Sequence, residues 1–220
     1  SLPLDKPGLS ALSQQVVNES GLGHLDRDQL NRAMAGKMTR LEFQTREDRF
    51  SFSGQTVPGE IEVLFQLLYA HLTDPAYRQQ AYDLAMNRFS QEYREMEHTV
   101  EGGMRLYGKR FLAGGDSRFG MPSYAEFTKL SMEDVRSWID PAIRKAPIEL
   151  SVAGDFQNER VIDLASRYFG SLPPREGLAE TKKTSNLPVF PIGEKLTVQV
   201  PTRIFKSLLV VAYPTEDTWN

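Results

Sequence analysis

The sequence predicts an α+β fold, and three patterns support this prediction. Two short runs of alternating apolar and polar residues, 41–43 and 50–52, flank a polar turn, which is typical of an antiparallel hairpin. Apolar residues recur at helical spacing over residues 61–72 and 77–104, as on the buried face of a helix. Residues 148–168 combine an alternating run, a Gly-Asp turn and another helical pattern. The chain therefore mixes helices with short strands.

Composition excludes several classes of protein. The chain has 220 residues, of which 40% are hydrophobic and 25% charged, so it can bury one good core or two small ones. The net charge of −3 gives no general field for nucleic acid, which we do not expect as a partner. The absence of cysteine excludes disulfides and thiolate chemistry.

The longest apolar run, Leu208–Tyr213, is far shorter than the roughly 20 residues that span a bilayer, so we expect no membrane span. Residues 1–8 do not resemble a signal peptide, and any export signal would lie outside this chain.

The first elements are a helix pair and a hairpin. Leu9, Leu12 and Val16 share a helical face, and the glycines of residues 21–23 separate this helix from a second one over residues 26–35. The hairpin follows.

The next elements are two longer helices. Pro58 is expected to start the first of them, whose apolar face runs from Ile61 to Leu72. The Asp74-Pro75 pair predicts the start of the second, because aspartate caps free amides and proline at the first helical position loses no hydrogen bond. The stripe from Tyr77 to Met104 is long for a globular protein, and we expect Gly102-Gly103 to break it near its end.

The second half predicts short helices and a strand. Ser131–Asp134 has the pattern of a capping box, and Pro141 falls inside or at the edge of the helix that it opens. Ile148, Leu150 and Val152 alternate with smaller or polar residues, which predicts a strand. Asn158 is the expected N-cap of the next helix, and Gly170 the expected left-handed residue just past its end.

The last part of the chain predicts a linker and two strands. Residues 175–188 are polar and without period, so we interpret them as an exposed linker. Leu196, Val198 and Val200 alternate, and residues 206–213 are apolar on both faces, which is typical of a strand in the middle of a sheet.

This order of elements resembles one repeat of the pitrilysin and insulinase family of zinc metallopeptidases, the inverzincins. The resemblance covers roughly residues 9–215, and its weight comes from the order of the motifs, since none is specific alone. It implies a mostly antiparallel sheet covered by helices on one side. It also implies that residues 1–220 are one truncated repeat of a larger parent, divided into residues 1–174, the linker and residues 189–220. The matching segments are Gly36-Lys37, Leu64–Leu68, Leu72–Pro75, Phe111–Gly120, Leu130–Asp134, Val152–Asp155 and Tyr168–Pro173.

The catalytic signature of this family is missing. In the active repeat an H-x-x-E-H motif on the first helix holds zinc through two histidines, while the glutamate polarises the bound water. The matching helix here, residues 9–20, contains no histidine, and its only acidic residue is Glu19. Glu92 and Glu95 lie near the region that supplies the third ligand, and we interpret them as solvent-facing charges. We therefore predict no catalytic, cofactor-binding or metal-binding residue in this chain, and zinc only in the active repeat of the parent.

The three histidines and one glycine-rich loop carry no site of their own. Arg94-Glu-Met-Glu97-His98 ends like the zinc motif, but a cation at the first ligand position repels zinc. His24 and His71 have no second ligand in helical register, and we interpret them as structural. The loop Gly114–Arg118 lacks the lysine of a phosphate-binding P-loop, and its composition predicts flexibility.

The function that the resemblance implies is that of a non-catalytic repeat. The parent would hydrolyse peptides, and this repeat would contribute to the peptide-binding chamber and to contacts with other repeats of the same chain. Family habit favours the bacterial periplasm over the cytoplasm. An alternative is a scaffold or docking subunit of a family member without peptidase activity. A third possibility is an unrelated α+β domain.

Overall fold

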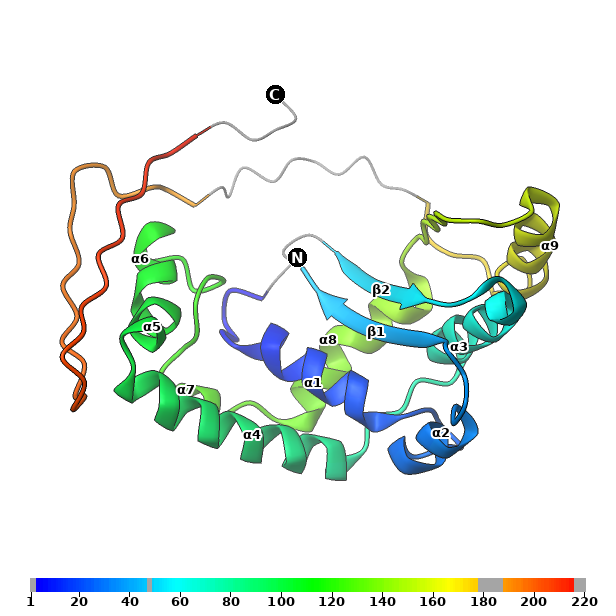
Figure 1. The fold of residues 1–220 in the computed structure, drawn as a ribbon, viewed down its shortest axis with the longest axis horizontal. Coiled ribbons are helices and arrows are strands. Elements are labelled where there is room, and N and C mark those ends of the chain that lie inside the picture. Colours follow the sequence, from blue (N-terminus) through cyan, green and yellow to red (C-terminus); the bar gives the residue numbers. More distant parts are fainter. Residues whose placement is uncertain (1–2, 47–48, 178–187, 216–220) are drawn as a thin grey trace. The chain divides into compact units, whose positions relative to one another are not determined.

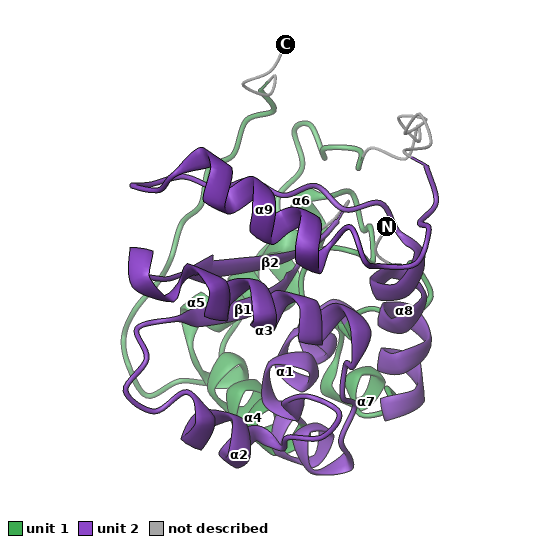
Figure 2. Ribbon diagram, turned by 90° about the vertical axis from the view of Figure 1, so that its right-hand side faces the viewer, with its two compact units in different colours: residues 1–9, 86–130, 183–220 green, residues 10–85, 131–182 purple. Residues whose placement is uncertain are grey.

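The computed structural model describes residues 3–46, 49–177 and 188–215. Figure 1 shows the order of the elements along the chain. The chain forms two compact units, which Figure 2 colours separately. Unit 1 comprises residues 1–9, 86–130 and 183–220, and unit 2 comprises residues 10–85 and 131–182.

Unit 2 contains the hairpin and most of the longer helices. The hairpin is formed by β1 (Arg40–Thr45) and β2 (Phe50–Gln55), which pair antiparallel with Phe43 opposite Phe52. This confirms the hairpin predicted from the alternating residues. Its helices are α1 (Leu9–Ser20), α2 (Arg27–Ala33), η1 (Pro58–Glu60), α3 (Ile61–Thr73), the start of α4 (Gln79–His98), α8 (Met132–Lys145) and α9 (Asn158–Tyr168).

Apolar packing holds the hairpin in place within unit 2. The Phe43 side chain is 1% exposed, and its ring lies 5.2 Å from that of Phe52 and 5.8 Å from that of Phe50. Phe50 in turn meets Trp138 of α8 edge-on at 4.8 Å. The alternation read from the sequence thus turns one face of the hairpin into the core.

Helix α8 begins as predicted. Ser131 and Asp134 form a complete capping box, in which the serine hydroxyl accepts from the Asp134 amide and the carboxylate accepts from the Ser131 amide. Pro141 lies inside the helix. Asn158, in contrast, is the first residue of α9 and not its cap, because Gln157 holds the cap position without a side-chain bond.

The start of α4 differs from the prediction. The Asp74-Pro75 pair does not begin a helix, since α3 ends at Thr73 and α4 begins at Gln79. The Asp74 carbonyl accepts a bond from the Gly23 amide at 2.9 Å, and Pro75 pairs with Leu22 in an isolated bridge. A long-range contact therefore keeps these residues extended and overrides the local helix signal.

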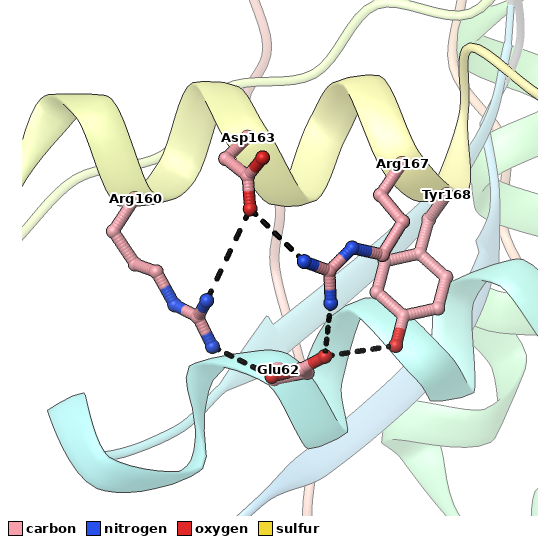
Figure 3. A network of polar contacts seen from close by, with 5 residues as sticks. All are labelled: Glu62, Arg160, Asp163, Arg167 and Tyr168. Carbon is pink, nitrogen blue, oxygen red and sulfur yellow. Dashed lines mark hydrogen bonds and ion pairs between the residues drawn. The ribbon is translucent and has the colours of Figure 1, made fainter.

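Helix α9 packs on α3 through aromatic rings and ion pairs. The Phe65 ring, which is 2% exposed, lies 6.5 Å from Tyr168 and 5.6 Å from Phe169. Beside it, the Glu62 carboxylate accepts bonds from Arg160 at 2.6 Å, Arg167 at 3.0 Å and the Tyr168 hydroxyl at 3.2 Å, as Figure 3 shows.

The end of α9 also differs in detail from the prediction. Gly170 does not adopt a positive φ. It is needed for another reason, because a Cβ at this position would lie 2.4 Å from the Ser166 carbonyl oxygen. Close approach to the preceding turn, and not a left-handed backbone, favours glycine here.

Unit 1 is built around the second half of α4. After α4 the chain continues through α5 (Val100–Gly103), the π-helix η2 (Met104–Gly108) and α6 (Lys109–Leu112), and α7 (Tyr124–Phe127) follows a loop. Phe89, Tyr93 and Phe127 are buried together, with the Phe127 ring centroid 4.6 Å from that of Phe89 and 5.4 Å from that of Tyr93. The buried Tyr93 hydroxyl donates to the Pro122 carbonyl at 2.9 Å, which satisfies its polar end.

The predicted break of the long helix lies a few residues earlier than expected. It falls at Thr99, whose hydroxyl accepts from the Gly102 amide at 3.2 Å and so caps α5. Gly102 is required for space, since a Cβ there would lie 2.1 Å from the Met96 carbonyl oxygen. The two glycines thus belong to the continuing helix and do not end it.

The strands predicted in the second half of the chain do not form. Residues 148–153, 196–200 and 206–213 are not assigned to a strand, and among the described residues the sheet consists of β1 and β2. The side chains of Ile148, Leu150 and Val152 are 41%, 39% and 36% exposed. A strand needs hydrogen bonds to a neighbouring strand, and among the described residues these segments belong to no sheet. The fold class, α+β with an antiparallel hairpin, is confirmed, but the sheet is smaller than expected.

Other expectations remain untested. Most of the predicted linker, residues 178–187, lies outside the described residues. The division of residues 1–220 into one truncated repeat with these parts stays a prediction.

Candidate functional site

The polar face of α1 bonds to the backbone of β1. Ser10, Gln14 and Asn18 are spaced four residues apart and therefore share one side of the helix. The Asn18 amide donates to the Phe43 carbonyl at 2.9 Å and accepts from the Phe43 N–H at 2.8 Å. Gln14 accepts from the Thr45 N–H at 3.3 Å, and the hydroxyls of Ser10 and Thr45 lie 2.7 Å apart.

These bonds define the outer edge of the hairpin. In an antiparallel pair, the backbone groups of alternate residues point away from the partner strand. Because both groups of Phe43 bond to α1, residues 41, 43 and 45 face outward from β2. The side chains of α1 cover positions 43 and 45, while Leu41, the next outward position, lines a pocket.

This pocket, which we call the α1–β1 pocket, lies within unit 2 and has a volume of about 750 Å³. Its walls come from α1, α2, both strands and α3, so separate parts of the sequence build it. Most of its polar side chains are uncharged amides or hydroxyls. They are Gln14, Gln15, Asn18, Asn31, Thr39, Ser53 and Gln55.

Charged groups are nearly balanced in the α1–β1 pocket. Arg27, Lys37 and Arg40 face Glu19 and Glu42 among its lining residues. Arg27 and Glu19 form an ion pair at 3.8 Å. The pocket therefore presents hydrogen-bonding groups of both kinds without a strong field of one sign.

His71 adds an uncharged acceptor to the same pocket. Its Nδ1 lies 2.8 Å from the Leu67 carbonyl, and because a carbonyl can only accept, Nδ1 carries the proton. Burial lowers the pKa of His71, the bond to Leu67 opposes this, and Arg27 lowers it further. The neutral ring, packed 5.4 Å from Phe52, leaves Nε2 as an acceptor. From the sequence, His71 was interpreted as a structural residue. No sequence motif marks this pocket.

The residues of α1 do not fit a zinc ion. Zinc binds imidazole, thiolate or carboxylate, whereas the residues spaced four apart on α1 carry amides that already bond to β1. Within residues 3–46, 49–177 and 188–215, no three His, Cys, Asp or Glu side chains lie close enough to hold a metal ion.

The remaining candidates from the sequence lie apart from the pocket. His98 Nδ1 bonds its own helix at the Arg94 carbonyl, 2.7 Å away. Glu92, expected to face solvent, forms an ion pair with Arg105 at 3.3 Å.

The Gly114–Arg118 loop contains an internal ion pair, and its predicted flexibility stays a prediction. Asp116 accepts from Arg118 Nε at 3.0 Å to each oxygen and from its Nη2, and Arg118 is the main cause of the lowered pKa of Asp116.

Among the described residues, none of the helices has the length and hydrophobicity that crossing a bilayer requires.

Comparison with known proteins identifies relatives of this fold. Residues 129–220 match the family model described as the peptidase M16 inactive domain. The chain is 19% identical over 224 residues to the chloroplastic stromal processing peptidase of Oryza sativa subsp. indica and 22% identical over 174 residues to that of Pisum sativum. These matches cover 98% and 76% of this chain but only 18% and 14% of the relatives. The chain thus spans less than a fifth of their length.

Solved structures show the same fold. A mutant of the ferredoxin protease FusC, solved in complex with Arabidopsis ferredoxin, aligns with a TM-score of 0.63 at 21% identity over 82% of this chain and 20% of that one. The periplasmic protease PqqL from Escherichia coli aligns with a TM-score of 0.63 at 17% identity over 80% of this chain and 19% of that one. These likenesses show the fold, and together with the match of residues 129–220 they favour the predicted resemblance over an unrelated α+β domain. The predicted resemblance is therefore confirmed: the chain is similar to a non-catalytic repeat of the M16 peptidases.

Proposed function

We propose that this chain is a non-catalytic repeat that holds peptide for a zinc peptidase whose active site lies in another repeat of the same parent. The α1–β1 pocket is the contact surface in this proposal. The observation that carries it is the pocket's lining of uncharged amide side chains beside the outward-facing Leu41.

The chemistry of the pocket suits an extended peptide. Each residue of a peptide presents one N–H donor and one carbonyl acceptor, and a side-chain amide can satisfy both. Asn31 and Gln55 line the pocket, and His71 Nε2 adds an acceptor. The nearly balanced charges favour no particular side chain, so binding would depend on the peptide backbone.

Strand addition to β1 can start at Leu41 but not continue past it. A peptide that pairs with an exposed strand uses the outward backbone groups of that strand. At residues 43 and 45 these groups already bond to Asn18 and Gln14. In this proposal the amides of the pocket, and not a long strand pair, provide most of the contact.

The relatives support the peptidase part of the proposal. Their names describe a stromal processing peptidase and a ferredoxin protease captured with ferredoxin, so both act on polypeptides. Zinc, hydrolysis and contacts with further repeats would belong to the parent, since α1 carries amides where the family's active helix carries imidazoles.

The test is binding without cleavage. Fluorescein-labelled β-casein, an unfolded polypeptide, should bind the purified chain in an anisotropy titration, and added zinc should produce no cleavage of it. Asn31→Trp fills the pocket from α2 and should weaken binding at least about tenfold, because it excludes the peptide from its contacts. Arg32→Trp, at an exposed neighbouring position outside the pocket lining, is the matched control and should bind normally.

Two results would contradict the proposal. Equal binding of casein by Asn31→Trp and Arg32→Trp would show that the α1–β1 pocket is not the binding surface. A chain that binds no casein at all would favour the alternative, a scaffold or docking subunit.

A further inference from the structure

A second pocket, within unit 1, contains an unpaired arginine. This pocket, which we call the Arg110 pocket, has a volume of about 740 Å³. It is formed by the end of α4, η2, α6, the loop after it, α7 and segment 189–196. The volume lies in the range of roughly 300–1,000 Å³ that is typical of sites for small ligands.

The unpaired groups of Arg110 form a carboxylate-binding pair. Its Nε and Nη2 atoms are buried, and among the described residues neither has a hydrogen-bond partner. These two nitrogens point their N–H groups in parallel along one side of the guanidinium, which matches the two oxygens of a carboxylate. Arg118 shows this geometry in the neighbouring loop, where the same two nitrogens bind Asp116.

Of the three glutamates that line the pocket, Glu126 already bonds to another residue. Glu126, which lines the pocket, accepts from the Ser123 amide at 3.0 Å and hydroxyl at 2.8 Å as part of the capping box of α7. The bonds to Ser123 lower the pKa of Glu126 most, and the charge of Arg110 adds a smaller effect. Arg110 is thus close enough to act on Glu126 electrostatically without bonding to it.

The rest of the pocket is mostly apolar. Its apolar lining includes Leu106 and Phe111 from helices, Met121 from the loop before α7, and Phe190, Ile192 and Leu196 from segment 189–196. Its charged lining residues are Arg110, the one cation, and the three glutamates Glu97, Glu126 and Glu194. A mostly apolar pocket with a few polar groups is the usual form of a ligand site. The group bound here would therefore combine a carboxylate with an apolar body.

We propose that the Arg110 pocket binds a carboxylate carried on an apolar or aromatic group, as in the C-terminal residue of a peptide. Nε and Nη2 are buried, and in this proposal the ligand reaches them by displacing segment 189–196, which lines the pocket. The segment is closely seated, since a Cβ on Gly114 would lie 2.2 Å from the Val189 carbonyl oxygen. This proposal concerns unit 1 only and does not depend on peptide binding in the α1–β1 pocket.

The first experiment compares an acid with its amide on the unchanged chain. N-acetyl-L-phenylalanine should bind in a calorimetric titration, while N-acetyl-L-phenylalaninamide, which lacks the carboxylate, should bind at least about tenfold more weakly. A second acid, 3-phenylpropanoate, separates a small organic acid from a peptide C-terminus, and tighter binding of the acetylated amino acid would favour the peptide. Equal affinity for acid and amide, or no binding of either acid, would overturn the proposal.

The second experiment uses a variant and its control. Arg110→Gln should abolish the preference for the acid over the amide. In the NMR spectrum of the chain without substitutions, the Nε–H signal of Arg110 should shift when the acid binds. Arg105→Gln is the control, because Arg105 is exposed, pairs with Glu92 and lies outside the pocket lining. Unaltered affinity in Arg110→Gln would refute the assignment. If that variant does not fold, the comparison of acid with amide and the Nε–H shift still decide.

Discussion

The Asn18 side chain bonds both the N–H and the carbonyl of Phe43. At this one residue of β1 it takes the place of a neighbouring strand. An unpaired buried amide or carbonyl costs free energy that its bond would otherwise offset. This face of α1 thus has a structural role, because it holds β1 in place.

Removing the Asn18 side chain should destabilise unit 2. Asn18→Ala leaves the N–H and carbonyl of Phe43 without these partners, so we expect the free energy of unfolding to fall by about 1–3 kcal/mol. Urea unfolding measures this. Asn31→Ala, at an exposed position of α2, should change it by no more than about 0.5 kcal/mol, and equal effects of the two variants would contradict the role of Asn18.

His71 should make stability depend on pH. Burial lowers its pKa in the folded chain from the ordinary value of 6.5, so below pH 6.5 the unfolded chain binds a proton that the folded chain does not. Stability from this group is therefore complete above that pH and declines as the pH falls toward the lowered pKa.

The variant His71→Gln tests this pH dependence. Urea unfolding at about pH 7.5 and about pH 5.5 should show a smaller loss of stability in the variant than in the unchanged chain. An identical loss in both would show that other groups cause the decline.

The role of a residue could be predicted from the sequence only where its partner lies within a few residues along the chain. The capping box of Ser131 and Asp134 spans four residues and was predictable. The partner of Asn18 lies on a strand 25 residues away, and the pockets combine side chains from several elements, which no spacing reveals. No sequence motif marks Arg110 either. Its proposed role depends on two buried nitrogens that have no hydrogen-bond partner among the described residues.

At the scale of elements, α9 is attached to α3 by two kinds of contact of unequal strength. The ion pairs of Glu62 in Figure 3 involve arginines that are about half exposed, so water and salt screen them. The Phe65 ring is almost fully buried against Tyr168 and Phe169.

Two substitutions should separate these contributions. Phe65→Ala should lower the free energy of unfolding by about 3–5 kcal/mol, since it removes a buried ring and leaves a cavity. Glu62→Gln should lower it by about 1 kcal/mol, and less in high salt. Urea unfolding at two salt concentrations checks both values, and a larger loss from Glu62→Gln would mean that the ion pairs dominate.

The junction of α3 and α4 explains one limit of prediction for elements. Asp74-Pro75 is a strong local start signal, yet contacts with Leu22 and Gly23 hold it extended. Local signals predicted the start of α8 correctly, because its capping box is made by residues within one turn of each other. The alternating residues 148–153 fail for the opposite reason, since a strand needs a second strand that the described residues do not provide.

At the scale of the whole molecule, the described structure exposes many large apolar side chains. Phe205 is fully exposed, and Leu209 is 86% exposed. Apolar patches of this kind favour association.

Charged substitutions at these positions should improve solubility without loss of stability. Phe205→Lys with Leu209→Lys should reduce association in light scattering and leave urea unfolding within about 0.5 kcal/mol. Leu164→Lys, at a fully buried site, should unfold the chain. A stability loss from the exposed pair similar to that of Leu164→Lys would show that these residues pack against something.

The whole chain should also not retain zinc. The α1 side chains lack the donors that zinc prefers, so dialysis against zinc followed by metal analysis should leave far less than one ion per chain. Stoichiometric retention, lost in Gln14→Ala, would contradict the assignment of α1 as a structural helix.

The bonds from α1 to β1 also limit which substitutions on α1 the fold can accept. Imidazoles placed four residues apart at Gln14 and Asn18 would remove the tethers to Thr45 and Phe43. Introducing metal ligands at these two positions would therefore loosen the hairpin. An engineer seeking activity here would need a new partner for the strand before a new ligand for the metal.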